Sequence, residues 1–474
     1  MARIIFLQNA LFEFLGPMHI AALLKRQGHD CDLLIGDNAA AFMPHLTKAN
    51  PDIIAFPVMT GNQRWAVNTA VKIKETLGCL AILGGPHPTF FPDIISECGI
   101  DVICRGEGED ALLELADAVD SGSDYSRIAN LWVKMPDGTV QKNDVRPLIE
   151  DLDAYPPPDR LLYNRYPELC RNPVKVFLSS RGCPYNCSFC FNHQMMELYK
   201  GKGRYVRHRS HGSLLKEIEE VTAASPTRRV YFCDDTFALQ RTWLLDFLPE
   251  YGRRIALPFH CLLRINQLDE EIARSLADNG CVTVFWGIES GDEKIRNVLL
   301  QKEIADTDIR KGAALLKQQG ISFRTYNIIG FPGETLKQAF KTVALNIEIG
   351  TDFPWCSLFM PYPGTKLADY AVSEGFLPAD VCAEDMEASF HISSALNNPD
   401  KDRIVNLHKF FQTAVRVPAL VPLIRQLIKL PPNPLFQLWF SLVYFILCVR
   451  SEGRSITNTL SLSMGNARYF MKSK

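Results

Sequence analysis

The chain has 474 residues, of which 47% are hydrophobic and 22% are charged. This balance is typical of a globular protein of two to four domains and excludes an intrinsically disordered one. With 51 Lys and Arg against 53 Asp and Glu, the net charge of −2 argues against a nucleic-acid-binding protein that works through bulk charge.

The first nine residues form a short strand-like run, with no long apolar region and no small-residue cleavage site. They do not resemble a signal peptide, and we expect a cytoplasmic location. In a reducing cytoplasm, the fourteen cysteines are metal ligands or core residues more often than disulfide partners.

Residues 1–145 alternate between strand and helix patterns, with helices expected over about 17–27, 64–77 and 110–118. The alternation predicts a doubly wound, Rossmann-like α/β domain, in which ligands bind outside the carboxyl ends of the parallel strands. Two glycine-rich turns, Gly84–Thr89 and Arg105–Glu109, lie at those ends. The expected strands are Ile4–Leu7, Asp32–Ile35, Ile53–Val58, Leu80–Leu83 and Val102–Cys104.

Residues 146–173 are rich in proline and are typical of a linker. Residues 174–375 resume the alternation with six strands, fewer than a closed (β/α)8 barrel has, so we expect an open, partial (β/α)6 TIM-like barrel. Residues 376–474 lose the alternation and are expected to be mainly helical. The six expected strands are Val174–Ser179, Arg229–Cys233, Phe259–Arg264, Val282–Gly287, Phe323–Ile329 and Trp355–Met360.

The most specific signal is a cluster of three cysteines, Cys183, Cys187 and Cys190, directly after the first barrel strand. Thiolates are soft ligands that suit zinc and iron–sulfur clusters. A structural zinc site that adds His193 as a fourth ligand is one alternative, and three unrelated free thiols are another. Active sites of such barrels lie at the carboxyl ends of the strands, which favours an iron–sulfur cluster with one open iron.

A Cys-x3-Cys-x2-Cys motif at this position resembles the radical S-adenosylmethionine (radical SAM) superfamily, over about residues 174–375. The resemblance implies that the three cysteines hold a [4Fe–4S] cluster whose open iron is chelated by S-adenosylmethionine. The reduced cluster then cleaves this cofactor to methionine and a 5′-deoxyadenosyl radical. An electron donor such as a flavodoxin or a ferredoxin is implied as a partner.

Three further stretches, and an aromatic residue inside the cysteine motif, resemble the cofactor-binding segments of this superfamily. Asp234 and Asp235 would pair with the methionine ammonium, although either Asp235 or Thr236 could instead cap a helix. The resemblance also assigns Glu289 and Ser290 to the ribose and methionine groups, with a simple turn as the alternative. It assigns the loop with Gly330 and Glu334, and the aromatic ring of Phe189, to the adenine; core packing is the alternative for Phe189.

The N-terminal turns resemble the cobalamin-binding domain of the B12-dependent branch of the superfamily, and an unliganded flavodoxin-like domain is the alternative. The pattern Asp-x-His-x-x-Gly, which marks a protein histidine ligand to cobalt, is absent from the first loop, so we assign no axial histidine. A role beside the corrin or its nucleotide is expected for His87. The residues assigned to cobalamin binding are Thr60, Gly84, Gly85, His87, Thr89, Gly106 and Glu107.

Two basic segments have no assigned role. Residues 199–211 are expected to form a solvated loop, or to lie near an anionic substrate or cofactor carboxylate. Residues 400–474 hold eleven Lys or Arg and three Asp or Glu, a local charge of +8, which makes them a candidate for contact with something anionic.

The apolar stretch Leu435–Val449 would be about 22 Å long as a helix, too short to span a hydrocarbon layer of about 30 Å. It could be a buried helix that closes the substrate side of the barrel. Alternatively, residues 415–449 could rest on an anionic membrane, which would suit a lipid or other apolar substrate.

The resemblance therefore implies a cobalamin-dependent radical SAM enzyme, with a methyltransferase as the first expectation. The deoxyadenosyl radical would remove a substrate hydrogen, and methylcobalamin, remethylated by a second S-adenosylmethionine, would deliver the methyl group to an unactivated carbon; on phosphorus the radical step would differ. A radical cyclase or rearrangement enzyme related to the anaerobic magnesium-protoporphyrin ester cyclase is one alternative. A non-enzymatic iron–sulfur or zinc module is another. The substrate, a small molecule or lipid, is not identified by any motif.

Overall fold

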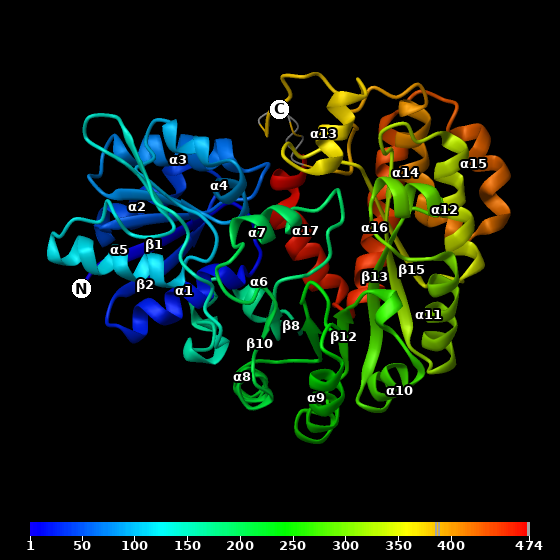
Figure 1. The fold of residues 1–474 in the computed structure, drawn as a ribbon, viewed down its shortest axis with the longest axis horizontal. Helices are drawn as coiled ribbons and strands as arrows, with labels where there is room; N and C mark the ends of the chain where they lie inside the picture. Colours follow the sequence, from blue (N-terminus) through cyan, green and yellow to red (C-terminus); the bar gives the residue numbers. More distant parts are fainter. Residues whose placement is uncertain (384–385, 387–388, 472–474) are drawn as a thin grey trace.

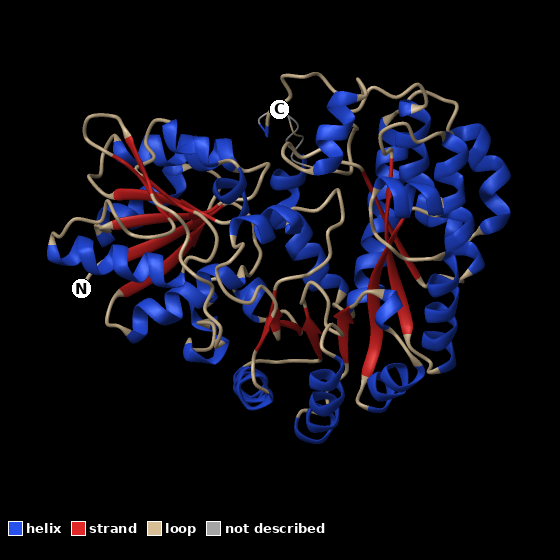
Figure 2. Ribbon diagram, in the orientation of Figure 1, coloured by secondary structure: helices blue, strands red, loops and turns tan. Residues whose placement is uncertain are grey.

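The computed structural model describes residues 1–383, 386 and 389–471. Its N-terminal part is a seven-stranded sheet with strand order β2-β1-β3-β4-β5-β6-β7 (Figures 1 and 2). The first five strands in sequence are parallel, as expected, and an antiparallel pair that we did not predict extends the edge. The strands are β1 (Arg3–Gln8), β2 (Asp30–Ile35), β3 (Ile53–Pro57), β4 (Leu80–Gly84), β5 (Val102–Cys104), β6 (Leu131–Lys134) and β7 (Val140–Lys142).

Helices cover both faces of this sheet, because its strands are apolar on both sides. In β1, Ile4 and Phe6 pack toward one face and Ile5 and Leu7 toward the other. The first face is covered by α1 (Leu15–Arg26) and α5 (Glu109–Ser121). The second face is covered by α2 (Ala39–Ala49), α3 (Gln63–Lys74) and the 3-10 helix η1 (Pro92–Ser96), and the short α4 (Pro86–Phe90) follows β4.

Residues 146–173 pack closely against the N-terminal sheet. Tyr163 is fully buried, donates a hydrogen bond to Gln8 Oε1 at 2.9 Å and accepts one from the Phe14 N–H at 3.0 Å. Tyr166 accepts a hydrogen bond from the Ile35 N–H at 2.5 Å. The segment is therefore an ordered connection that packs on the sheet. Its helical turns are η2 (Leu152–Ala154), η3 (Arg160–Tyr163) and α6 (Pro167–Cys170).

The second sheet is the expected open barrel of six parallel strands, in the order β15-β14-β13-β12-β11-β8. The strands are β8 (Val174–Phe177), β11 (Arg229–Phe232), β12 (Phe259–Leu262), β13 (Cys281–Glu289), β14 (Ser322–Ile329) and β15 (Phe353–Leu358). The helical elements between them are α8 (His211–Ala224), α9 (Arg241–Arg254), η4 (Ile265–Gln267), α10 (Glu270–Asp278), the π-helix η5 (Ile295–Leu299), α11 (Asp306–Gln318) and α12 (Leu336–Glu348).

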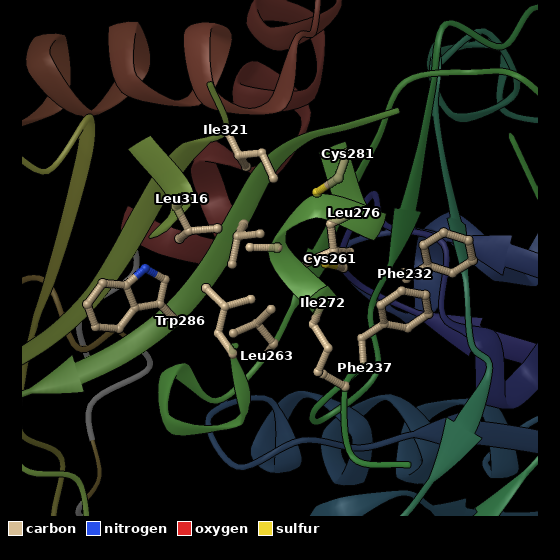
Figure 3. Packing of buried hydrophobic residues seen from close by; sticks show 14 of the residues in the cluster. Phe232, Phe237, Cys261, Leu263, Ile272, Leu276, Cys281, Trp286, Leu316 and Ile321 are labelled. Atoms are coloured by element: carbon tan, nitrogen blue, oxygen red, sulfur yellow. The ribbon is translucent and has the colours of Figure 1, made fainter. Parts of the chain in front are cut away.

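The main core of the barrel lies between its strands and the outer helices. Figure 3 shows Trp286 of β13, Leu316 of α11 and Ile272 of α10 in this cluster, with Phe232 and Phe237 at its other end. Successive side chains of a strand point to opposite faces of the sheet. In β13, the alternate residues Val284, Trp286 and Ile288 all belong to this outer core. The predicted fold class, a Rossmann-like domain followed by a partial barrel and a helical region, is confirmed.

The C-terminal region is helical, with α13 (Lys366–Ser373), α14 (Lys401–Arg416), η7 (Pro418–Leu420), α15 (Val421–Leu427), α16 (Pro434–Glu452) and α17 (Ile456–Met471). Helix α14 is almost wholly buried beside β15, α12 and α16. Helix α17 returns toward the N-terminal domain, where Asn466 hydrogen-bonds with the backbone of Leu11 (Figure 1). The predicted division at residues 145, 173 and 375 stays a prediction.

Candidate functional site

The cysteine motif lies on an irregular loop between β9 (Ser180–Arg181) and α7 (Asn192–Leu198). Strand β9 pairs with β10 (Arg207–His208) in a two-stranded ribbon that we did not predict. Gly182 has a φ of +93°, and a Cβ there would lie 2.3 Å from the Tyr205 carbonyl oxygen. Glycine is therefore required at the point where the loop leaves the ribbon.

Backbone contacts fix the loop against the end of the barrel. The Ser188 N–H donates to the Leu300 carbonyl at 3.0 Å, and the Leu367 N–H donates to the Ser188 carbonyl at 2.9 Å. The Arg264 guanidinium lies 3.8 Å above the Tyr185 ring and 4.0 Å from the Cys187 sulfur. Arg264 thus places a positive charge beside one thiol of the motif.

The three thiols differ in exposure, with Cys187 buried and Cys183 and Cys190 half-buried. Burial raises the pKa of Cys183 and raises the pKa of Cys190 to about 11, so metal binding has to displace protons here. In the described part of the chain, no group of three or more His, Cys, Asp or Glu side chains surrounds a point that could hold a metal ion, and the suggested site with His193 is not assembled there. The chemistry of the donor set, three soft thiols on one short loop, fits an iron–sulfur cluster.

The two adjacent aspartates have different environments. Asp234 is fully buried and accepts hydrogen bonds from the Ser179 N–H at 3.1 Å, the Ser179 hydroxyl at 2.8 Å and the Ser180 hydroxyl at 2.5 Å. Burial raises the pKa of Asp234, and these hydrogen bonds oppose the rise. Asp235 is exposed and lines a cavity of about 280 Å³ beside the cysteine loop. Of the two, Asp235 has the accessible carboxylate for the predicted contact with the cofactor ammonium.

The alternative helix-capping role of Asp235 or Thr236 is wrong. Helix α9 begins after Gln240, four residues beyond Thr236. The Thr236 hydroxyl donates instead to Gln267 Oε1 at 2.7 Å, and Gln267 in turn donates to the Tyr185 hydroxyl at 3.0 Å. This chain of hydrogen bonds ties the end of β11 to the cysteine loop.

Glu289 ends β13 with a φ of +60°, an unusual value for a residue other than glycine. Its buried carboxylate pairs with Lys302 at 2.7 Å, and the Lys302 ammonium lies 6.0 Å from the centre of the Phe189 ring. The Ser290 hydroxyl accepts a hydrogen bond from the Asp292 N–H at 3.2 Å. Phe189 packs against the apolar cluster of Phe331 and its neighbours, which is compatible with both core packing and contact with adenine.

The loop after β14 is closed by a buried carboxyl group. Gly330 has a φ of +84°, and its N–H and that of Phe331 donate to Glu334 Oε2 at 2.5 and 3.1 Å. The Glu334 Oε1 atom has no hydrogen-bond partner among the described residues. Burial raises the pKa of Glu334 to about 8, so this side chain is mainly protonated at neutral pH.

In the N-terminal domain, the predicted cobalamin-binding residues lie together at the carboxyl edge of the sheet. Thr60 hydrogen-bonds with His87 Nδ1 at 3.1 Å. Thr89 donates to the Gly85 carbonyl at 2.8 Å and accepts from the Gly106 N–H at 3.0 Å. Gly85 and Gly106, which are 21 residues apart in sequence, are thus linked through one threonine hydroxyl.

A cavity of about 310 Å³ opens at this edge and is lined mainly by apolar side chains, among them Phe6, Phe56 and Leu112, and by the predicted residues Gly84, Gly85, Gly106 and Glu107. His19 also lines it, and its Nδ1 atom has no hydrogen-bond partner among the described residues. Burial, assisted by the charge of Arg181, lowers the pKa of His19 to about 3. The small residues and apolar walls fit the nucleotide tail of a corrinoid, and a neutral imidazole faces that space.

Sequence reasoning missed an ionic cluster that joins the two domains. Glu107 forms a two-point pair with Arg207, at 2.6 and 3.1 Å, and also lies 3.3 Å from Arg181. Arg181 pairs with Glu109 at 2.6 Å. The side chain of Glu107, which we assigned to cobalamin, is thus engaged in protein contacts. The basic segment 199–211 was the available signal, but its Arg207 is buried and paired, so the expectation of a solvated loop is wrong for this residue.

Comparisons with known proteins match both halves of the site. The model of the radical SAM superfamily matches residues 177–345, and the model of the B12 binding domain matches residues 12–116. An uncharacterized methyltransferase of Pyrococcus horikoshii is 31% identical over 381 residues, which are 77% of this chain and 79% of the relative. The chain belongs to the B12-binding branch of the radical SAM superfamily.

Two other proteins are similar to the chain at lower identity. The anaerobic magnesium-protoporphyrin IX monomethyl ester cyclase of Rubrivivax gelatinosus is 27% identical over 68% of this chain, which covers 59% of that protein. The radical S-adenosylmethionine methyltransferase TsrM from Kitasatospora setae has a similar fold, with a TM-score of 0.67, 18% identity, and coverage of 79% of this chain and 76% of TsrM.

This radical SAM protein is thus an enzyme of a methyltransferase family, and a purely structural iron–sulfur or zinc module is the wrong alternative. Its two matched domains imply a [4Fe–4S] cluster, S-adenosylmethionine and cobalamin as cofactors. The radical SAM match begins in β8 and contains the cysteine loop, and the B12 match contains both glycine turns.

Proposed function

We propose that this enzyme transfers a methyl group to an unactivated carbon or to phosphorus of a small-molecule or lipid substrate. When bound, the cluster supplies the electron that cleaves S-adenosylmethionine, and cobalamin supplies the methyl group. The observation that carries the proposal is the ionic contact of Glu107, in a cobalamin-domain turn, with Arg181, two residues before Cys183. It keeps the two cofactor-binding regions side by side, as transfer from one cofactor to a substrate activated by the other requires.

Within this proposal, the roles of the site residues follow from their surroundings. Cys183, Cys187 and Cys190 hold the cluster, with Arg264 beside Cys187. The exposed carboxylate of Asp235 binds the methionine ammonium, while the buried Asp234 holds the turn that leads to the cysteine loop.

Three further segments complete the proposed cofactor contacts. The pair of Glu289 with Lys302 positions polar groups at the end of β13. Ser290, the next residue after Glu289, would contact the ribose and methionine groups. The protonated Glu334 keeps the Gly330 turn closed, and this turn and Phe189 would contact the adenine.

We also propose partners and a location. The electron donor is a small redox protein such as a flavodoxin or a ferredoxin, and no nucleic acid takes part. The location is cytoplasmic. One described helix, Pro434–Glu452, is long and apolar enough to cross a membrane by length and composition. We propose that the region 415–449 makes peripheral contact with a membrane and does not span it.

The experiment is anaerobic reconstitution followed by iron, sulfide and corrinoid analysis and an assay for 5′-deoxyadenosine. Cys183→Ala, Cys187→Ala and Cys190→Ala are expected to lose the cluster and deoxyadenosine formation while they retain cobalamin. Cys98→Ala, an exposed cysteine outside the loop, is the matched control and should behave as wild type. Cluster formation in all three variants would reject the assignment.

A radical cyclase is the second candidate, because the Rubrivivax relative is named as a cyclase. The two functions differ in what happens to the methyl group of S-adenosylmethionine. Recovery of isotope from its labelled methyl group in cobalamin, and then in a product, supports methyl transfer. Deoxyadenosine formation with no label in either supports the cyclase.

A further inference from the structure

Helix α16 presents an apolar face to solvent, which we call the α16 outer face. Its side chains recur at helical spacing, so they lie along one side of the helix. Leu435 and Leu438 are 74% and 68% exposed. The α16 outer face consists of Leu435, Leu438, Trp439, Leu442 and Ile446.

The opposite face of α16 is held by the protein. Phe440 and Leu447 are buried, and Tyr444 packs against Trp355 of β15 with ring centres 4.6 Å apart. At the end of the helix, Ser451 accepts a hydrogen bond from Arg324 of β14, and Glu452 lies 3.4 Å from the same guanidinium. The expectation of a buried helix is therefore wrong for the outer face of α16.

These contacts also argue against a membrane-spanning role for α16. The helix has 19 residues, about 28 Å, so its length alone would nearly suffice. To cross a bilayer, however, it would have to leave Trp355 and expose Arg324, a buried cation, without its partner Glu452. The helix can instead lie in the plane of an interface, with its outer face in lipid and its inner face on the protein.

The segment of the chain that contains the α16 outer face is apolar and positively charged. Of the 18 exposed large hydrophobic side chains among the described residues, nine lie between Val417 and Ile446. Residues 403–451 contain six Lys or Arg and no Asp or Glu. The exposed cations nearest in sequence to the helix are Arg416, Arg425, Lys429 and Arg450.

We infer that the α16 outer face docks on a membrane that contains anionic lipids. The positive charge of this region favours a membrane over a second copy of the chain as the partner of this face. A symmetric dimer through this face would bring the same cations together with no acidic side chain between 403 and 451 to compensate them, whereas anionic headgroups would neutralise them. Trp439, whose indole N–H donates to Thr413 at 2.9 Å while the ring is 41% exposed, suits the boundary between headgroups and acyl chains.

The inference specifies the peripheral contact proposed above and does not depend on methyl transfer. It predicts a substrate that is itself delivered from the membrane, since an enzyme held at a bilayer meets apolar molecules there at high local concentration.

The test is flotation of the full chain with vesicles of phosphatidylcholine alone and of phosphatidylcholine mixed with phosphatidylglycerol. The protein is expected to float with the mixed vesicles, much less with phosphatidylcholine alone, and less as salt is raised. The double variant Leu438→Ser, Leu442→Ser should lose about tenfold or more in binding. Leu161→Ser, which is 69% exposed on η3 outside the patch, is the control and should bind as wild type.

A second variant separates charge from apolar contact. Lys429→Gln with Arg450→Gln leaves the α16 outer face intact and should weaken binding only to the anionic vesicles. Both double variants should form deoxyadenosine normally without vesicles, so a failure of docking is distinguishable from a failure of the proposed function. Failure of the wild-type protein to float with anionic vesicles overturns the inference, and so does a dimer in light scattering that Leu438→Ser, Leu442→Ser abolishes.

Discussion

The carboxylate of Glu107 and the guanidinium of Arg207 form a two-point ion pair, 2.6 and 3.1 Å long, between the N-terminal domain and the barrel. Glu107 also pairs with Arg181, which directly precedes Gly182 and lies two residues before the first cluster cysteine. One carboxylate thus connects a cobalamin-domain turn with the ribbon from which the cysteine loop departs.

Glu107→Gln should weaken this connection. Arg207 is only 3% exposed in its side chain, so loss of the charge leaves a buried guanidinium undercompensated, and we expect the free energy of unfolding to fall by about 2–4 kcal/mol. Urea denaturation measures the change. Glu197→Gln, which removes an exposed pair with Lys200, is the control and should cost less than about 0.5 kcal/mol. Equal effects would show that Glu107 is an ordinary surface residue.

Gly182→Ala should impair cluster binding more than folding. The added Cβ meets the Tyr205 carbonyl at 2.3 Å, and the φ of +93° is strained for alanine, so the loop has to shift away from β10. Iron and sulfide content after reconstitution should drop to less than about half. Gly212→Ala, where a Cβ meets no atom within 4 Å, is the matched control and should load normally. Full loading of the Gly182 variant would contradict the geometry.

Glu334 should make stability depend on pH in a defined direction. Burial raises its pKa to about 8 from 4.5, so between these values the folded state keeps a proton that the unfolded chain loses. Its contribution to stability is therefore complete below pH 4.5 and decreases as the pH rises toward 8. Between pH 5 and 7 the stability that this group contributes should decrease by about 2.5 kcal/mol.

Glu334→Gln retains an oxygen that accepts from the Gly330 and Phe331 N–H groups but removes the titration. The difference in unfolding free energy between the variant and wild type should grow in favour of the variant from pH 5 to 7. Denaturation curves at several pH values measure it, with Glu374→Gln, an exposed residue, as control. Parallel pH profiles of wild type and Glu334→Gln would refute the prediction.

His19→Leu should separate stability from cofactor binding. The substitution removes a buried nitrogen that has no hydrogen-bond partner among the described residues, so the protein without cofactor should be as stable as wild type or more so. Loss of the polar group that faces the cavity should weaken cobalamin binding by about tenfold, or about 1.4 kcal/mol, in a spectroscopic titration with hydroxocobalamin.

His29→Leu is the comparison for this variant, because His29 is buried with partners, the Ala2 N–H at 3.2 Å and Asp117 at 3.0 Å. It should lose stability without a specific effect on cobalamin. Unchanged cobalamin affinity in His19→Leu would remove His19 from the site.

Most of the fold could be predicted because the parallel strands are short apolar runs between helical segments. The ladder β6–β7 could not, since β7 is only Val140-Gln-Lys and its edge position leaves no apolar pattern. The β9–β10 ribbon escaped for a similar reason, because two-residue strands carry no periodicity.

Within the site, the cysteine loop and the glycine turns were recognisable because their function fixes residue types at short spacing. The partners of Asp234 and Glu107 were not, because Ser179 and Arg207 lie 55 and 100 residues away and only the fold brings them together. The exposed face of α16 was likewise hidden, since a sequence of apolar residues does not reveal which side of a helix the protein covers.

Helix α17 has a consequence for how the molecule is made. Asn466 hydrogen-bonds with the backbone of Leu11, and Leu462 belongs to the same apolar cluster as Phe6 and Met18. The N-terminal domain therefore obtains part of its packing from a helix that lies 455 residues later in the sequence. This packing can form only after α17 has been synthesised, so folding of the N-terminal sheet and its closure by α17 are separate events in the life of this enzyme.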